Sequence, residues 1–386
     1  MIMPFTFNTT ARIVFAEGAA EKLDEHAAFL GNRVLLVTDK GMIGTGLVAP
    51  IADALRKAGR TVEIFDDVLA DPPRAIVMAA AAQARHMDAT GVLGLGGGSS
   101  LDVAKLAALL APGTESLDAA FGVGNAKGPR LPLALVPTTA GTGSEVTPIS
   151  IVTVEDDEKR GVVSPVILPD LAVLDPRLTV GLPAHVTAAT GVDAMVHAIE
   201  AYTSKSANNN PLSRNLATEA LRLLGGHIER AVSDGGDMEA RSAMLLGSML
   251  AGQAFANSPV AAVHALAYPI GGRFHVPHGL SNALVLPHVL RFNAPEAASA
   301  YAELAPHAFP ALGTGGGTQD VAARFIEELA ALTARLGLET RLRQVGISEN
   351  DLAMMAHDAM KQTRLLVNNP REVSEEDAFA IYRAAY

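Results

Sequence analysis

Three histidines and one aspartate stand in otherwise apolar stretches of the sequence and could together bind a metal ion. Asp193 and His197 are four residues apart in a helical pattern, so both side chains lie on one face of the expected helix. His264 and His278 come from two further segments of the same region. Imidazoles and a carboxylate without a thiolate suit Fe²⁺, Zn²⁺, Ni²⁺ or Mn²⁺, and the sequence does not choose among these ions.

A simpler interpretation exists for the first pair. An aspartate and a histidine four residues apart in a helix are common, and hydrogen bonds to neighbours would satisfy a buried histidine at His197. His264 and His278 argue against that interpretation, because burying imidazoles without partners costs free energy. The spacing of Asp193 and His197 also differs from the H-E-x-x-H motif of zinc proteases. We therefore expect the four side chains to converge on a metal.

A glycine-rich run has the composition of a phosphate-binding turn. Gly97, Gly98 and Ser99 follow an apolar strand pattern and precede a helical one. In that position the backbone N–H groups and the helix N-terminus can bind a pyrophosphate. The run does not match the G-x-G-x-x-G fingerprint, and a tight strand-to-helix turn without a ligand is the alternative.

Hydroxyl and carboxylate groups follow two other strand patterns. Thr138, Thr139 and Thr142 could contact a phosphate, a ribose or a nicotinamide amide, although such clusters also form plain loops. Asp39 could accept a hydrogen bond from a ribose hydroxyl and repel a 2′-phosphate, which favours NAD over NADP. The alternative for Asp39 is an aspartate that only begins a helix.

The elements that must position these residues change in kind near residue 183. Residues 1–183 alternate short strand patterns, beginning with Phe5–Phe7, and helical patterns, which is typical of a parallel sheet. From Ala184 onward long helical patterns dominate, for example over 280–292. We expect an α/β dinucleotide-binding domain with a parallel Rossmann-like sheet over 1–183 and an all-helical metal- and substrate-binding domain over 184–386.

Composition limits the possible partners. The chain has 386 residues, no cysteine and a formal net charge of −11, without a cluster of lysine and arginine. Nucleic acids and anionic membranes need a basic surface, so neither is expected as a partner. The sequence shows no signal peptide and no apolar run of about 20 residues that could span a membrane. We expect a cytoplasmic protein that acts on a small molecule.

Five segments of the sequence resemble the iron-containing (group III) alcohol dehydrogenases, which have the dehydroquinate synthase-like fold. They occur in the family's order and extend over nearly the whole chain. The segments are VTDKG at 37–41, GGGSSLDVAK at 96–105, PTTAGTGSEVTP at 137–148, GVDAMVHAIEAY at 191–202 and VHALAYPIGGRFHVPHGLSNALVLPHV at 263–289.

The resemblance implies a metal-dependent alcohol dehydrogenase. Such an enzyme transfers hydride reversibly between NAD and a primary alcohol or diol, or its aldehyde, in the cleft between its domains, with the metal as Lewis acid. The resemblance implies a homodimer, with Fe²⁺ as the first choice of metal and Zn²⁺ or Ni²⁺ as others. The implied metal ligands are Asp193, His197, His264 and His278, and the implied nucleotide contacts are Asp39, Gly97, Gly98, Ser99, Thr138, Thr139, Thr142, Lys159 and Leu178.

The chain departs from some family members at one position. Those members have a further histidine four residues after the equivalent of His264, and this chain has Tyr268 there. His275 stands where some members have a different polar residue. Either Tyr268 or His275 could replace the missing histidine in substrate contact or proton transfer, and both could instead be packing residues.

Two other enzymes remain as alternatives. A maleylacetate reductase-like NAD(P)H-dependent reductase shares the fold and does not require the metal. A dehydroquinate synthase-like lyase would need a basic cluster for its phosphorylated substrate, and the region 191–279 has none. A non-catalytic NAD-binding protein is disfavoured, because the four metal ligands would then be dispensable.

Overall fold

The computed structural model describes residues 3–154 and 158–386, and the chain divides into two compact units. One unit is Asn8–Gly181, and the other is Leu182–Tyr386 together with the segment that ends at Phe7. The Thr6 backbone N–H donates to Asn208 Oδ1 at 2.9 Å, and Asn208 Nδ2 donates to the Thr6 carbonyl at 2.8 Å. These bonds explain why the N-terminal segment belongs with the helices. The expected domain boundary between residues 183 and 184 stays a prediction.

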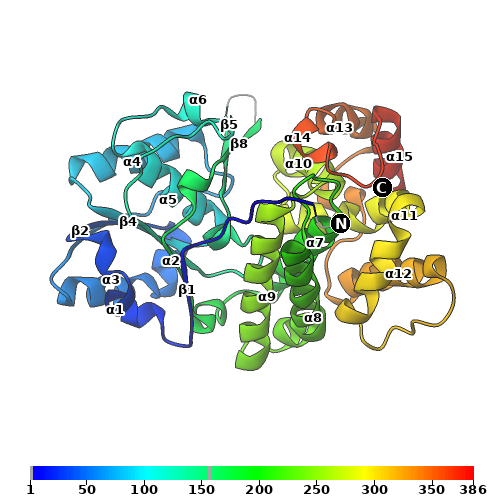
Figure 1. Ribbon diagram of the computed structural model, residues 1–386, viewed down its shortest axis with the longest axis horizontal. Helices are drawn as coiled ribbons and strands as arrows, with labels where there is room; N and C mark the ends of the chain where they lie inside the picture. The colour runs from blue at the N-terminus through cyan, green and yellow to red at the C-terminus, as the bar shows by residue number, and fades with distance from the viewer. Residues whose placement is uncertain (1–2, 155–157) are drawn as a thin grey trace. The chain divides into compact units, whose positions relative to one another are not determined.

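The Asn8–Gly181 unit is built on a six-stranded parallel sheet with the strand order β1-β9-β6-β4-β2-β3 (Figure 1). A smaller sheet has the order β5-β8-β7. The strands are β1 (Arg12–Phe15), β2 (Arg33–Val37), β3 (Thr61–Phe65), β4 (Gly91–Gly96), β5 (Gly122–Val123), β6 (Leu133–Pro137), β7 (Ile149–Thr153), β8 (Lys159–Val163) and β9 (Leu171–Leu174).

Side chains of the parallel strands alternate between two hydrophobic cores. Val34 and Leu36 of β2 pack in one core, and Leu35 and Val37 pack in the other. All four are fully buried, as expected for a sheet that helices cover on both faces. The helices of this unit are α1 (Leu23–His26), α2 (Lys40–Thr45), α3 (Val48–Lys57), α4 (Arg74–His86), α5 (Gly98–Leu110) and α6 (Leu117–Ala120).

The strand order determines which loops are neighbours. Because β6, β4 and β2 are adjacent and parallel, their carboxyl ends lie side by side at one edge of the sheet. The chain leaves these ends at Thr138, Gly97 and Thr38 respectively. The Thr138 N–H also donates to the Gly96 carbonyl at 3.0 Å, which joins two of the loops directly.

A buried lysine fastens the loop after β6 to helix α5. Lys105 Nζ is fully buried and donates to Ser144 Oγ at 2.7 Å and to the Ile149 carbonyl at 2.7 Å. Asp102 Oδ1 accepts from Ser144 Oγ at 2.6 Å and Asp102 Oδ2 from the Ile151 N–H at 2.8 Å. Since buried charges need such partners, the network holds the loop in one conformation relative to α5.

The described strands all lie outside the Leu182–Tyr386 unit, which consists of helices and the loops between them, and α7, α8 and α9 lie side by side (Figure 1). Helix α7 also packs against α11, and every residue from Gly191 to Ala201 is buried. A helix buried on all sides must satisfy its polar side chains internally. The helices are α7 (Ala184–Thr203), α8 (Pro211–Ser233), α9 (Met238–Asn257), α10 (Ala262–Phe274), α11 (His278–Ala308), α12 (Thr318–Arg335), α13 (Leu352–Ala359), α14 (Thr363–Leu366) and α15 (Glu375–Ala385).

These two units confirm the expected fold class, a parallel α/β sheet followed by helices. The expected strand at Phe5–Phe7 is wrong, because this short segment bonds to the Asn208 side chain instead of a strand. Helix α11 continues well beyond the expected end at residue 292, through Pro295 and Pro306. Its packing against α7, α8 and α12 offsets the roughly 3 kcal/mol that an internal proline costs. None of the described helices is long and apolar enough to cross a membrane.

The buried Glu145 predicts a pH-dependent stability. Burial raises the pKa of Glu145 to about 7 from 4.5, so between these values the folded protein keeps a proton that the unfolded chain has lost. The free energy of unfolding should therefore fall as the pH rises from 4.5 to 7, by up to about 3 kcal/mol. Glu145→Gln should flatten this pH dependence in urea denaturation. An equal slope in wild type and Glu145→Gln, with exposed Glu21→Gln as control, would contradict the assignment.

Candidate active site

The four expected metal ligands meet within the helical unit. Asp193 and His197 lie one turn apart in the buried middle of α7, His264 lies in the first turn of α10, and His278 is the first residue of α11. One donor atom from each residue lies within 4.8 Å of the donors of the other three. Three helices thus bring together four side chains that are up to 85 positions apart in the sequence.

The donor atoms face one another closely. His264 Nε2 lies 3.9 Å and His278 Nε2 3.7 Å from Asp193 Oδ1. The imidazole of His197 stacks between Phe255 and His264, with ring centroids 4.3 and 4.7 Å away. Asp193, His197 and His264 are each less than 5% exposed, whereas the His278 side chain is 35% exposed. The cluster therefore opens to solvent on the His278 side.

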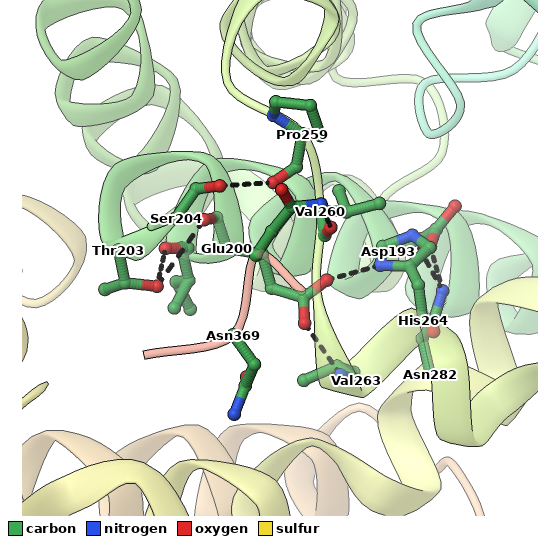
Figure 2. A network of polar contacts seen from close by, with 12 residues as sticks. Asp193, Glu200, Thr203, Ser204, Pro259, Val260, Val263, His264, Asn282 and Asn369 are labelled. Atoms are coloured by element: carbon green, nitrogen blue, oxygen red, sulfur yellow. Dashed lines mark hydrogen bonds and ion pairs between the residues drawn. The ribbon is translucent and has the colours of Figure 1, made fainter. Parts of the chain in front are cut away.

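Glu200 lies behind His264 and fixes its orientation (Figure 2). Its Oε2 is 2.6 Å from His264 Nδ1, and its Oε1 accepts from the Val263 N–H at 2.7 Å. Because an ionised carboxylate only accepts hydrogen bonds, His264 Nδ1 carries the hydrogen and Nε2 presents its lone pair to the other donors. A carboxylate behind a histidine is the usual arrangement around protein metal ions.

The end of α7 also holds the chain just before α10 (Figure 2). Ser204 Oγ donates to the Pro259 carbonyl at 2.7 Å. Ser258 Oγ donates to the Ala201 carbonyl, also at 2.7 Å. With the bond from Val263 to Glu200, these contacts set the position of His264 relative to Asp193 and His197 on the same helix.

The residues present fit a divalent metal ion. Donors bound to one ion at 2.0–2.2 Å lie at most about 4.4 Å apart, close to the spacing observed here. Asn282, one turn after His278, reaches the same point: its Nδ2 donates to Asp193 Oδ1 at 2.6 Å and lies 3.4 Å from His264 Nε2. Its buried Oδ1 has no hydrogen-bond partner in the described chain. The donor set is that of a nitrogen- and oxygen-ligated transition metal.

In the Asn8–Gly181 unit, the expected nucleotide residues gather at the carboxyl edge of β2, β4 and β6. Gly97 caps the N-terminus of α5, and Gly98 and Ser99 form its first turn. A Cβ at Gly98 would lie 2.8 Å from Thr142 Cγ2, so only glycine allows this close approach of the loops. Thr138 and Thr139 leave the end of β6 beside them, within reach of one ligand.

Asp39 begins helix α2, and its expected contact with a ribose stays a prediction. Its Oδ1 accepts from the Met42 N–H at 2.9 Å and thereby caps α2. Its Oδ2 accepts from Ser100 Oγ at 3.2 Å, which places the carboxylate beside the glycine-rich turn. The aspartate therefore begins a helix and also contributes negative charge to the edge where the loops meet.

The remaining expected site residues lie in other elements. Lys159 begins β8 and forms a 2.5 Å ion pair with Asp71, and Leu178 is a core residue that is 7% exposed. The Tyr268 ring lies one turn after His264, with its centroid 6.4 Å from that of His278. His275 is exposed and ends α10 in a left-handed conformation, outside the four-residue cluster. The roles expected for these four residues stay predictions.

Family models match both units of the chain. A model described as "Iron-containing alcohol dehydrogenase" matches residues 10–176, and one described as "Fe-containing alcohol dehydrogenase family, C-terminal" matches residues 187–386. The chain belongs to the iron-containing alcohol dehydrogenase family. The family match confirms the resemblance carried by the five sequence segments.

Other members of the iron-containing alcohol dehydrogenase family align over nearly their whole length. The chain is 41% identical to long-chain-alcohol dehydrogenase 1 of Geobacillus thermodenitrificans, covering 98% of this chain and 97% of the relative. A crystal structure of 1,3-propanediol oxidoreductase has a TM-score of 0.95 at 36% identity and covers 99% of this chain and 100% of its own. Sulfoacetaldehyde reductase of Bifidobacterium kashiwanohense, solved in complex with NAD⁺, has a TM-score of 0.87 at 29% identity, with 99% of each chain covered.

Membership of the iron-containing alcohol dehydrogenase family establishes the class of reaction. The protein is an oxidoreductase that acts on alcohols, and its four-residue cluster could hold a divalent metal ion. The expected enzyme class and function are thus confirmed, and the NAD⁺ complex of a relative supports the expected nucleotide cofactor. These relatives do not support the maleylacetate reductase-like or dehydroquinate synthase-like alternatives.

Sequence reasoning missed three residues that organise these sites. Glu200 and Asn282 lie within the quoted segments but gave no separate signal, although Glu200 follows His197 at helical spacing. Asp102 also lies within a quoted segment, and it belongs to the buried network around Lys105. Glu200 and Asp102 are charged residues inside otherwise apolar helical patterns, and this signal could have identified them. Asn282 is uncharged and gives no such signal.

Glu200→Gln should weaken metal binding without removing a metal ligand. Glutamine keeps the shape of the side chain but turns an N–H group toward His264 or Val263, so the imidazole loses its fixed orientation. Loss of such a supporting contact costs about 10–100-fold in metal affinity. The measurement is the Zn²⁺ affinity of the purified protein in competition with a chelator.

Glu303→Gln is the matched control, because Glu303 is an exposed glutamate of the same unit. The melting temperature without metal separates a packing defect from a metal-binding defect. Equal Zn²⁺ affinities for Glu200→Gln and Glu303→Gln would exclude a positioning role for Glu200.

Proposed function

We propose that Asp193, His197, His264 and His278 hold Fe²⁺ and that the protein transfers hydride reversibly between a primary alcohol or diol and NAD. The observation that supports the metal assignment is the convergence of four donor atoms within 4.8 Å, with Glu200 directly behind His264. Zn²⁺ and Ni²⁺ suit the same donors and are the alternative ions. The family description favours iron among them.

When bound, the metal supplies a Lewis acid that lowers the pKa of an alcohol hydroxyl. The chain's own residues prepare the site for it. Asp193 contributes a negative charge, Glu200 keeps the lone pair of His264 Nε2 directed inward, and Asn282 holds Asp193 Oδ1. We assign substrate contact to Tyr268, because its ring lies near that of His278. The exposed His275 is the second choice for this role.

The proposed NAD site is the carboxyl edge of β2, β4 and β6. Gly97, Gly98 and Ser99 bind the pyrophosphate through backbone N–H groups at the start of α5, which carries a partial positive charge. The hydroxyls of Thr138, Thr139 and Thr142 serve the same cofactor, and Asp39 accepts from the ribose. Lys159 and Leu178 are further proposed contacts that rest on the family resemblance alone.

The relatives guide the choice of substrate. Similar proteins are named as dehydrogenases of long-chain alcohols and of 1,3-propanediol, and as a reductase of sulfoacetaldehyde. All three names describe a primary alcohol or the matching aldehyde, which supports a terminal hydroxyl as the reacting group here. We further propose a homodimer in the cytoplasm and a division into domains at residues 183 and 184.

His264→Ala should abolish turnover and metal binding while NADH binding remains. The imidazole belongs to the metal cluster of the helical unit, whereas the proposed nucleotide contacts belong to the Asn8–Gly181 unit. Metal content is measured by elemental analysis, NADH binding by fluorescence and turnover with a short primary alcohol. His357→Ala, an exposed histidine of the same unit, is the control. Loss of NADH binding with the metal retained would overturn the assignment.

Asp39→Asn should increase the use of NADP⁺. Asparagine keeps a side-chain oxygen that can cap α2, but it removes the negative charge that repels a 2′-phosphate. We expect the ratio of kcat/KM for NADP⁺ to that for NAD⁺ to rise at least tenfold, which corresponds to about 1.4 kcal/mol. An unchanged ratio would show that Asp39 serves only to cap the helix.

A further inference from the structure

A second concave site lies within the helical unit, in residues that the proposed reaction does not use. It is a cavity of about 270 Å³ lined by α11, α12, the segment before the short helix Leu342–Val345, and the end of α15. Alanines and Pro287 form its apolar part, and His288, Arg291, Thr340 and Arg341 form its polar part. At roughly 30 Å³ per water, this volume equals about nine waters.

The charged residues that line this cavity are all basic. Two arginines line it, and none of the described lining residues is acidic. Arg291 directs Nε and Nη2 to a single oxygen, Glu327 Oε1, at 3.0 and 2.9 Å. Arg341 is exposed and forms no ion pair with any carboxylate in the described part of the chain. In a protein with a net charge of −11, Arg341 thus brings an unpaired guanidinium group to a cavity that the ion-paired Arg291 also lines.

Burial and the charges of both arginines, Arg291 and Arg341, together lower the pKa of His288. The pKa falls to about 4, against the opposing charge of Glu327. Both guanidinium groups therefore act on the same imidazole. At neutral pH this imidazole is uncharged and still has one N–H group to donate.

We propose that the cavity binds a small oxyanion, the phosphate or carboxylate group of an organic molecule. Guanidinium groups donate hydrogen bonds in a planar fork that matches the oxygens of either group. His288 and the hydroxyl of Thr340 add two further possible donors. The apolar wall leaves room for a short carbon chain beside the anionic group.

This site differs from the proposed metal and NAD sites. Helix α11 carries His278 and Asn282 in its first turns and Pro287, His288 and Arg291 two or three turns later. An anion held by the later turns would therefore contact the same helix that supplies a metal ligand. The proposal does not depend on the metal or on the alcohol, so its test can fail while the proposed function holds.

The test compares anion binding by two neighbouring arginine variants of the full chain. Inorganic phosphate and acetate are titrated by calorimetry at low ionic strength, with saturating NAD⁺ present to block the glycine-rich turn. Arg341→Gln should weaken binding at least tenfold, whereas Arg343→Gln should leave it unchanged. Arg343 lies two residues after Arg341, in the short helix Leu342–Val345, and does not line the cavity, so Arg343→Gln makes the same charge change outside the site.

Both variants replace exposed side chains, and circular dichroism checks that each is folded. Arg341-dependent binding of phosphate alone identifies a phosphate site, and Arg341-dependent binding of acetate identifies a carboxylate site. Equal binding by Arg341→Gln and Arg343→Gln, or no binding of either anion by the wild type, overturns the proposal.

Discussion

The short contact between Glu200 and His264 is the interaction on which the helical unit depends most. A buried carboxylate is costly unless its oxygens accept hydrogen bonds, and here one oxygen accepts from the imidazole of His264 and the other from the backbone of α10. The same two bonds therefore satisfy a buried charge, position α10 against α7 and orient His264. Burial on every side of α7 makes these bonds obligatory, since water cannot replace them.

The Asn8–Gly181 unit also buries an ionisable side chain, but here it is a lysine instead of a glutamate. Lys105 is fully buried, and its partners come from the loop after β6 and from its own helix. In both units a buried charged group does not itself face the proposed ligand but fixes the segment that does. Such networks are rigid because each partner would lose a hydrogen bond if the loop moved.

Much of this architecture could be predicted from the sequence. Apolar runs of four to six residues between helical patterns are a strong local signal, so the six strands of the parallel sheet could be predicted, whereas β8 of the smaller sheet could not. Lys159–Val163 alternates poorly and carries two basic residues, and its pairing with β7 and β5 makes it a strand. The convergence of the four proposed metal ligands was predictable, because buried polar side chains in an apolar helix need polar partners. Asn282 and Glu200 were not, because their roles depend on distances between helices that no local pattern contains.

The hydrogen bonds between Thr6 and Asn208 join residues 202 positions apart, and they have a consequence for synthesis on the ribosome. All of the Asn8–Gly181 unit has been translated before α7 exists, so its sheet can form while the helices are still missing. The N-terminal segment, although made first, must wait until Asn208 has emerged before it can bind. The segment around Thr6 therefore reaches its final partner only after about half of the chain has been made, and it stays unpaired while the parallel sheet is already able to fold.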